Sequence, residues 1–83
     1  MMKKVLVSIY VLKLDKTYDV KLPINLPMKD VLELIQNTIK EMNDAYEINN
    51  NVKLYESLSG NLLNINNIVK FSGVKNGEKL MLV

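Results

Sequence analysis

Apolar and polar residues alternate in several short stretches of the chain, and this two-residue period is typical of β-strands. Residues 4–12 are apolar on both faces, which predicts a strand in the middle of a sheet. Residues 18–22 alternate cleanly between apolar and charged side chains. They therefore predict a strand that pairs with residues 4–12 in a hairpin and has one solvent-exposed face. Pro23 should end this second strand because proline has no N–H to donate to the ladder.

The period changes to that of an α-helix over residues 28–42. Pro27 suits the start of a helix, and Asp30 and Lys40 lie at the ends that the helix dipole favours for their charges. Positions spaced four, four and three residues apart form the expected buried stripe: Val31, Ile35, Ile39 and Met42. The expected solvent-facing side consists of Lys29, Glu33, Gln36, Asn37 and Glu41. The segment is therefore an amphipathic helix that covers one face of a sheet.

The second half of the chain predicts further strands at residues 52–56 and 79–83. Residues 62–65 form a short strand or an irregular stretch, and Asn76-Gly77 is a strong turn signal before the last strand. We expect the last strand to return beside the first and to run parallel to it. This order predicts one α+β domain over residues 1–83, a ubiquitin-like β-grasp with a mixed four- to five-stranded sheet and one helix on one face.

Two irregular segments connect these elements. Residues 43–51 are polar, with Tyr46 and Ile48 as the expected anchors to the core. Before the last turn, one helical turn is expected to bury Ile68 and Phe71.

The composition excludes several kinds of chemistry. Eleven lysines against nine acidic residues give a net charge of +2, and the lysines are spread over every element, so we expect no nucleic-acid partner. The chain has no Arg, Cys or His, which removes bidentate phosphate recognition, thiolate chemistry and the commonest general base. We therefore expect no catalytic residue, no cofactor and no metal site.

The remaining polar clusters have simpler explanations. The carboxylates Glu41, Asp44 and Glu47 follow one another without a glycine-centred calcium loop, so we interpret them as a solvated surface. Ser57 and Ser59 precede Gly60, as is common in a β-turn, and the chain has no histidine to activate either hydroxyl.

The N-terminus resembles a secretion signal superficially, since Lys3 and Lys4 precede an apolar run. This run has eight residues and is rich in β-branched side chains, so we interpret it as a strand. The sequence has no stretch near the about 18–20 apolar residues of a membrane helix. We expect a cytoplasmic protein without direct membrane insertion.

Strand alternation places several apolar side chains on the sheet face opposite the helix. The candidate protein-binding residues on this face are Leu6, Tyr10, Tyr55 and Met81. An exposed apolar patch on a small domain marks a partner surface. The alternatives are that the connector 43–51 or another loop covers this face, or that the strand register is shifted by one residue.

Two segments resemble YukD/EsaB-type proteins, the small ubiquitin-like components encoded with type VII (WXG100, ESX-like) secretion systems of low-GC Gram-positive bacteria. The first covers residues 17–35, with TYDVKLP followed by LPMKDVLELI, and the second is GVKNGEKLML near the end. The resemblance implies an accessory or regulatory role in the cytoplasm, recruited to the inner face of the cell membrane. It also implies a protein partner in the cytoplasmic part of the secretion apparatus, and it carries over no catalytic motif.

Other functions stay open at this point. The chain ends at Val83 without the Gly-Gly tail of ubiquitin, so a conjugating or sulfur-carrier role is disfavoured. An interaction domain of another pathway is the main alternative, and a carrier protein lacking that tail is a weaker one. The outer sheet face could also pair two copies of the chain into a homo-oligomer.

Overall fold

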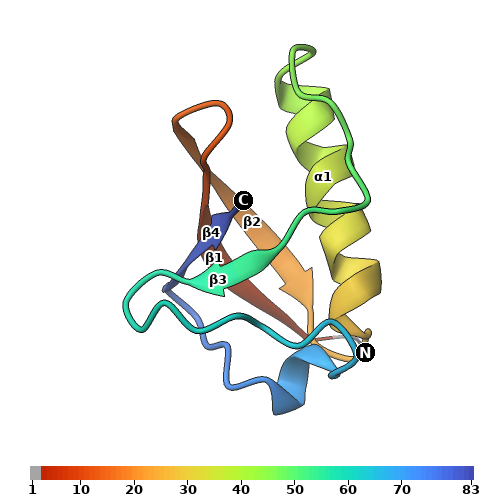
Figure 1. The fold of residues 1–83 in the computed structure, drawn as a ribbon. Helices are drawn as coiled ribbons and strands as arrows, with labels where there is room; N and C mark the ends of the chain where they lie inside the picture. The colour runs from red at the N-terminus through yellow and green to blue at the C-terminus, as the bar shows by residue number, and fades with distance from the viewer. Residues whose placement is uncertain (1–2) are drawn as a thin grey trace.

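A computed structural model describes residues 3–83 as one four-stranded mixed sheet with a single α-helix packed on one face (Figure 1). The elements in chain order are β1 (Lys4–Val11), β2 (Lys16–Pro23), α1 (Met28–Met42), β3 (Leu54–Glu56), the 3₁₀ turn η1 (Val69–Phe71) and β4 (Glu78–Leu82). The helix bounds agree with those expected, and the strand bounds shift by one or two residues at several ends. The predicted α+β architecture is confirmed.

The strand order in the sheet is β2-β1-β4-β3, so β1 is central, as its two apolar faces predict. β1 pairs antiparallel with β2, where Val7 lies opposite Val20. It pairs parallel with β4, where Ile9 lies opposite Leu80. The first and last strands are therefore neighbours and parallel, which is the β-grasp closure that the element order predicts.

The core lies between α1 and the inner face of the sheet. Val31, Ile35 and Ile39 of α1 have no exposed surface, and neither do Ile9 and Leu80 of the strands. Three predicted helix positions and the inward-facing strand positions thus meet in one buried cluster. Burying such side chains contributes roughly 1.5–3 kcal/mol each, which makes this layer the main source of stability.

Two helix positions differ from the expected pattern. Met42 was expected in the buried stripe but is 59% exposed, because it is the last residue of α1 and the chain leaves the helix at Asn43. Gln36 was expected on the solvent side but is 4% exposed. Its amide is held by the connector 43–51, which packs along the helix and covers this flank (Figure 1).

The irregular segments also differ in part from the expectation. Tyr46 is buried as predicted, whereas Ile48 is 49% exposed. Phe71 is 67% exposed, and Val69 is buried in its place. The backbone explains the change: the N–H of Val69 donates to the carbonyl of Leu26 at 3.1 Å, which turns Val69 inward at the start of η1.

The predicted short strand at residues 62–65 is reduced to one bridge between Leu62 and Tyr55. The N–H of Leu63 donates to the carbonyl of Leu54, and the N–H of Glu56 donates to the carbonyl of Asn61, both at 2.9 Å. This short contact covers part of the free edge of β3. The following residues then diverge from β3 and leave a groove.

Candidate protein-interaction surface

The sheet face opposite α1, here called the outer face, carries a row of large side chains across three strands. Tyr10 on β1 lies opposite Met81 on β4, and Met81 lies opposite Tyr55 on β3. Residues directly opposite in a ladder share one face, with Cβ atoms about 5 Å apart. All three side chains are half-buried. The structure therefore brings together three of the four predicted binding residues, which we call the aromatic row.

The fourth predicted residue, Leu6, lies on the outer face but apart from the aromatic row. It is 45% exposed and about 13 Å from Tyr10 along β1, at about 3.3 Å per residue. Ser8 lies between them and donates to Asp19 Oδ1 at 2.9 Å, and Lys79 is paired with Ser8 on its other side. This polar band separates Leu6 from the row.

Leu6 is held in place by the turn before β4. Its N–H donates to Asn76 Oδ1 at 2.8 Å, and its carbonyl accepts from the N–H of Gly77 at 2.8 Å. Gly77 has a φ of 83°, a left-handed conformation that glycine adopts without strain. The predicted Asn-Gly turn therefore anchors the Leu6 end of the outer face.

Three further apolar side chains lie near the opposite end of the outer face. Leu12, Leu62 and Val83 are 50%, 53% and 39% exposed. Leu12 and Val83 continue the alternation of β1 and β4 by one residue, and Leu62 bridges to Tyr55. The predicted strands 4–12 and 79–83 already include Leu12 and Val83 on this face, whereas no signal in the sequence placed Leu62 there. The apolar surface is thus centred on the aromatic row and extends away from Leu6.

The connector 43–51 does not cover this face. It packs against α1 on the other side of the sheet, where Tyr46 donates its hydroxyl to Gln36 Oε1 at 2.7 Å. The N–H of Asn49 donates to the same oxygen at 2.9 Å. The strand pairing also keeps the expected register, with Tyr10, Tyr55 and Met81 on the face away from the core.

Tyr10 is tied to the β1–β2 hairpin. Its hydroxyl donates to Asp15 Oδ1, and this hydrogen bond, with a smaller effect from burial, raises the pKa of the Tyr10 phenol above its usual value of 10.0. Asp15 has a φ of 52°, so glycine is the replacement that tolerates its backbone. The aspartate orients the Tyr10 ring by holding its hydroxyl.

Asp15→Gly should lower the pKa of Tyr10 toward about 10, because it removes both the acceptor and the negative charge. Since the folded-state pKa is raised, the contact stabilises the fold at lower pH and is lost as pH rises through that pKa. Carbon-13 NMR of the tyrosine ζ carbon measures the titration, with Asp19→Ala as the control that leaves it unchanged. An unaltered Tyr10 titration in Asp15→Gly would contradict the assignment.

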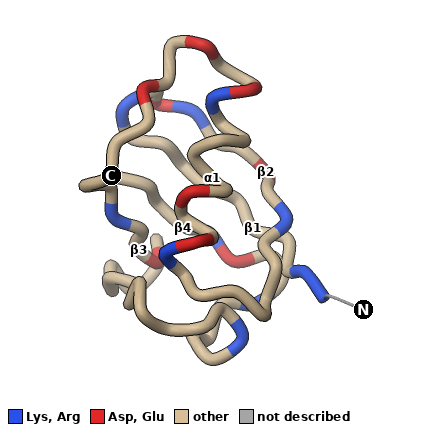
Figure 2. The backbone as a smooth tube through the Cα atoms, turned by 90° about the vertical axis from the view of Figure 1, so that its right-hand side faces the viewer, with Lys and Arg blue, Asp and Glu red and all other residues tan. Residues whose placement is uncertain are grey.

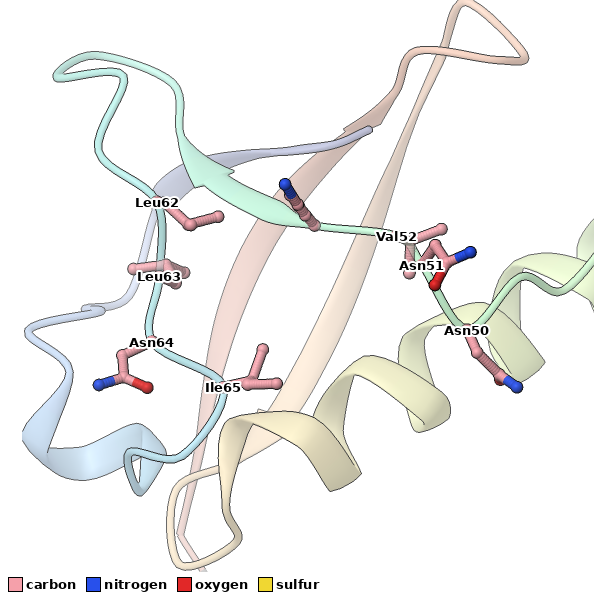
Figure 3. Close-up of a pocket in the computed structure, with 8 residues that line it drawn as sticks. Asn50, Asn51, Val52, Leu62, Leu63, Asn64 and Ile65 are labelled. Carbon is pink, nitrogen blue, oxygen red and sulfur yellow. The ribbon is translucent and has the colours of Figure 1, made fainter.

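A groove lies beside β3, between the residues that precede it and the segment that follows Leu62 (Figure 3). Its volume is about 740 Å³, and its lining residues are Asn50, Asn51, Val52, Lys53, Leu62, Leu63, Asn64 and Ile65. A smaller hollow of about 390 Å³ shares Asn50, Val52 and Ile65 and continues toward α1. Two irregular segments form the groove, so no periodic sequence pattern could predict it.

The described part of the chain offers little acid–base chemistry. Lys53 is the one ionisable side chain that lines the larger groove, and lysines and acidic residues are interspersed along the backbone (Figure 2). Within residues 3–83 no three His, Cys, Asp or Glu side chains gather into a metal site. Over the same residues, no helix has the length and apolarity to cross a bilayer.

Comparison with known proteins defines the fold class. No family model matches the chain, and no curated protein matches it either. Solved structures do match, with TM-scores as high as 0.79 at 14% identity. The ubiquitin-like domain of the Mycobacterium tuberculosis type VII secretion system protein EccD1 has a TM-score of 0.72 at 17% identity, with 99% of each chain covered.

Two further matches show how widely this fold is used. One protomer of the ESX-3 core complex has a TM-score of 0.71 at 18% identity, covering 98% of this chain but 16% of that one. A chain of the toluene 4-monooxygenase HD complex with 4-bromobenzoate has a TM-score of 0.78 at 17% identity, with 98% of each chain covered. At these identities the similarity shows the fold alone, and this chain has a ubiquitin-like β-grasp fold.

Proposed function

We propose that this chain is a non-catalytic interaction module and an accessory or regulatory component of a bacterial type VII secretion system, of the YukD/EsaB type. The aromatic row carries the proposal, because its large side chains lie together on a sheet face that no second layer from residues 3–83 covers. The similarity to YukD/EsaB-type sequences and to the EccD1 domain supports the choice of secretion system. In this role the chain acts in the cytoplasm at the inner face of the membrane.

The proposed partner is a cytoplasmic part of the membrane-bound secretion apparatus. Tyrosine is enriched among the residues that dominate interface energies, because its ring buries a large area while its hydroxyl keeps a polar contact. Tyr55 and Tyr10 flank Met81, and exposed Leu12, Leu62 and Val83 extend the apolar area. The partner surface should therefore be apolar at its centre and polar at its rim.

Tyr55→Ala should weaken binding to the partner by about 2 kcal/mol, a loss typical of a central interface tyrosine. The purified chain is titrated by calorimetry against the cytoplasmic domains of a type VII secretion apparatus. Glu33→Ala is the matched control, since Glu33 is an exposed residue of α1 on the opposite layer. Thermal unfolding of each variant checks that the fold is retained.

Three outcomes decide between the functions. If Tyr55→Ala and Tyr10→Ala both retain full binding and full secretion, the aromatic row is not the docking site. If the wild type binds no component of the secretion machinery, the role in secretion is wrong. Capture of one unrelated protein by the wild type, lost in Tyr55→Ala, would instead indicate an interaction domain of another pathway.

A further inference from the structure

β2 forms one edge of the sheet, and the hydrogen-bonding direction of its residues follows from the pairing. The N–H of Ile24 donates to the carbonyl of Lys3, so the backbone groups of Ile24 point toward β1. Because this direction alternates along an antiparallel strand, the backbone groups of Leu22, Val20 and Tyr18 also point toward β1. The N–H groups of Thr17, Asp19 and Lys21 consequently point away from the sheet. Because β1 is the one neighbour of β2 in the sheet, these N–H groups face no partner strand among residues 3–83.

This edge is complementary to itself in charge. Thr17, Asp19 and Lys21 are exposed on the outer face of β2. A second copy aligned antiparallel, with the two-fold axis at Val20, places Asp19 of each copy opposite Lys21 of the other. Because both residues have outward N–H and C=O groups, this register also forms backbone hydrogen bonds. Registers centred on Asp19 or on Lys21 would instead oppose like charges.

The helix adds an apolar contact on the inner side of the same edge. One flank of α1 is covered by the connector, which binds Gln36, and Leu34 lies on the opposite flank of the helix. Leu34 is 40% exposed and Met42 is 59% exposed. Asn43 donates to the hydroxyl of Tyr18 on β2 at 3.4 Å, so this end of the helix lies beside the strand.

We propose that two copies of this chain associate through β2, antiparallel about Val20, to form one continuous eight-stranded sheet. The interface is isologous, since each copy contributes the same strand edge and the same helix flank. Asp19 and Lys21 set the register, the outward backbone groups form the ladder, and Leu34 and Met42 supply apolar area. The aromatic row lies on other strands and stays available, so this inference is independent of the proposed function.

The purified chain is tested for self-association by sedimentation over a concentration series. Asp19→Lys puts two lysines on each edge, and Lys21→Asp puts two aspartates there. We expect each variant alone to raise the dimer dissociation constant by about tenfold or more, because like charges oppose each other. An equimolar mixture of the two variants should form heterodimers, since every lysine then faces an aspartate.

Amide hydrogen exchange gives a second readout that does not depend on charge. In the wild type, the amides of Asp19 and Lys21 should become protected as concentration rises, while Val20, already paired with β1, should not change. A wild type that stays monomeric at millimolar concentration would overturn the proposal and identify the charges and Pro23 as protection of the edge against pairing. Self-association that neither variant weakens would overturn it as well.

Discussion

Replacing Ile35 by alanine should lower the free energy of unfolding by about 2–5 kcal/mol. Ile35 has no exposed surface and lies at the centre of the α1 stripe that faces the sheet. The substitution removes buried methyl and methylene groups and leaves a cavity, and close-packed neighbours relax only partly into it. Urea unfolding measures the change, since a domain of this size is expected to unfold in one cooperative step.

Two further variants calibrate this loss. Ile35→Val removes one methylene and should cost about 0.5–1.5 kcal/mol. Leu58→Ala removes a side chain that is 87% exposed, so the stability should change by less than about 0.5 kcal/mol. A loss below about 1 kcal/mol for Ile35→Ala would mean that the helix does not pack as described.

Replacing Gln36 by alanine should lower the free energy of unfolding by about 1–3 kcal/mol, although a substitution at a solvent-facing position would cost little. Gln36 Oε1 accepts hydrogen bonds from the Tyr46 hydroxyl at 2.7 Å and from the N–H of Asn49 at 2.9 Å. Its Nε2 donates to the carbonyl of Asn49 at 3.0 Å. The truncation leaves these groups without hydrogen-bond partners. Burial also raises the pKa of the Tyr46 phenol, because a charged phenolate is poorly solvated at that site.

A double-mutant cycle tests whether the hydrogen bond to Tyr46 causes the loss. In the Tyr46→Phe background, Gln36→Ala should cost less, because the buried hydroxyl is no longer present to be stranded. Asn37→Ala is the matched control, an exposed amide on the same helix. Equal costs of Gln36→Ala in both backgrounds would show that the Tyr46 contact contributes nothing to stability.

The structure also gives a physical reason why the connector 43–51 has a defined position despite its polar sequence. Tyr46 is 1% exposed, and its hydroxyl and the backbone of Asn49 are both bonded to one side chain of α1. One glutamine therefore orders a long polar segment beside the helix. This arrangement leaves the outer face free for the aromatic row.

The arrangement of the candidate binding residues on the sheet was predicted in part. Alternation alone placed Tyr10, Tyr55 and Met81 on one face, and the strand register then made them neighbours across three strands. Alternation also places Ser8 between Leu6 and Tyr10 on this face, whereas the pairing of Ser8 with Asp19 and Lys79 depends on the register of β2 and β4. The groove beside β3 had no sequence signal, since it arises where two irregular segments diverge.

Local patterns in the sequence predict the order of the elements, the bounds of α1, the central position of β1 and the inward faces of helix and strands. These features follow from local periodicity, which a chain carries in every short window. Tertiary structure alone decided the burial of Gln36, the exposure of Met42 and Phe71, and the shape of the outer surface. Each of these depends on which other segments lie against the residue. A polar side chain is buried where hydrogen bonds satisfy it, and an apolar one is exposed where no other element of the described residues covers it.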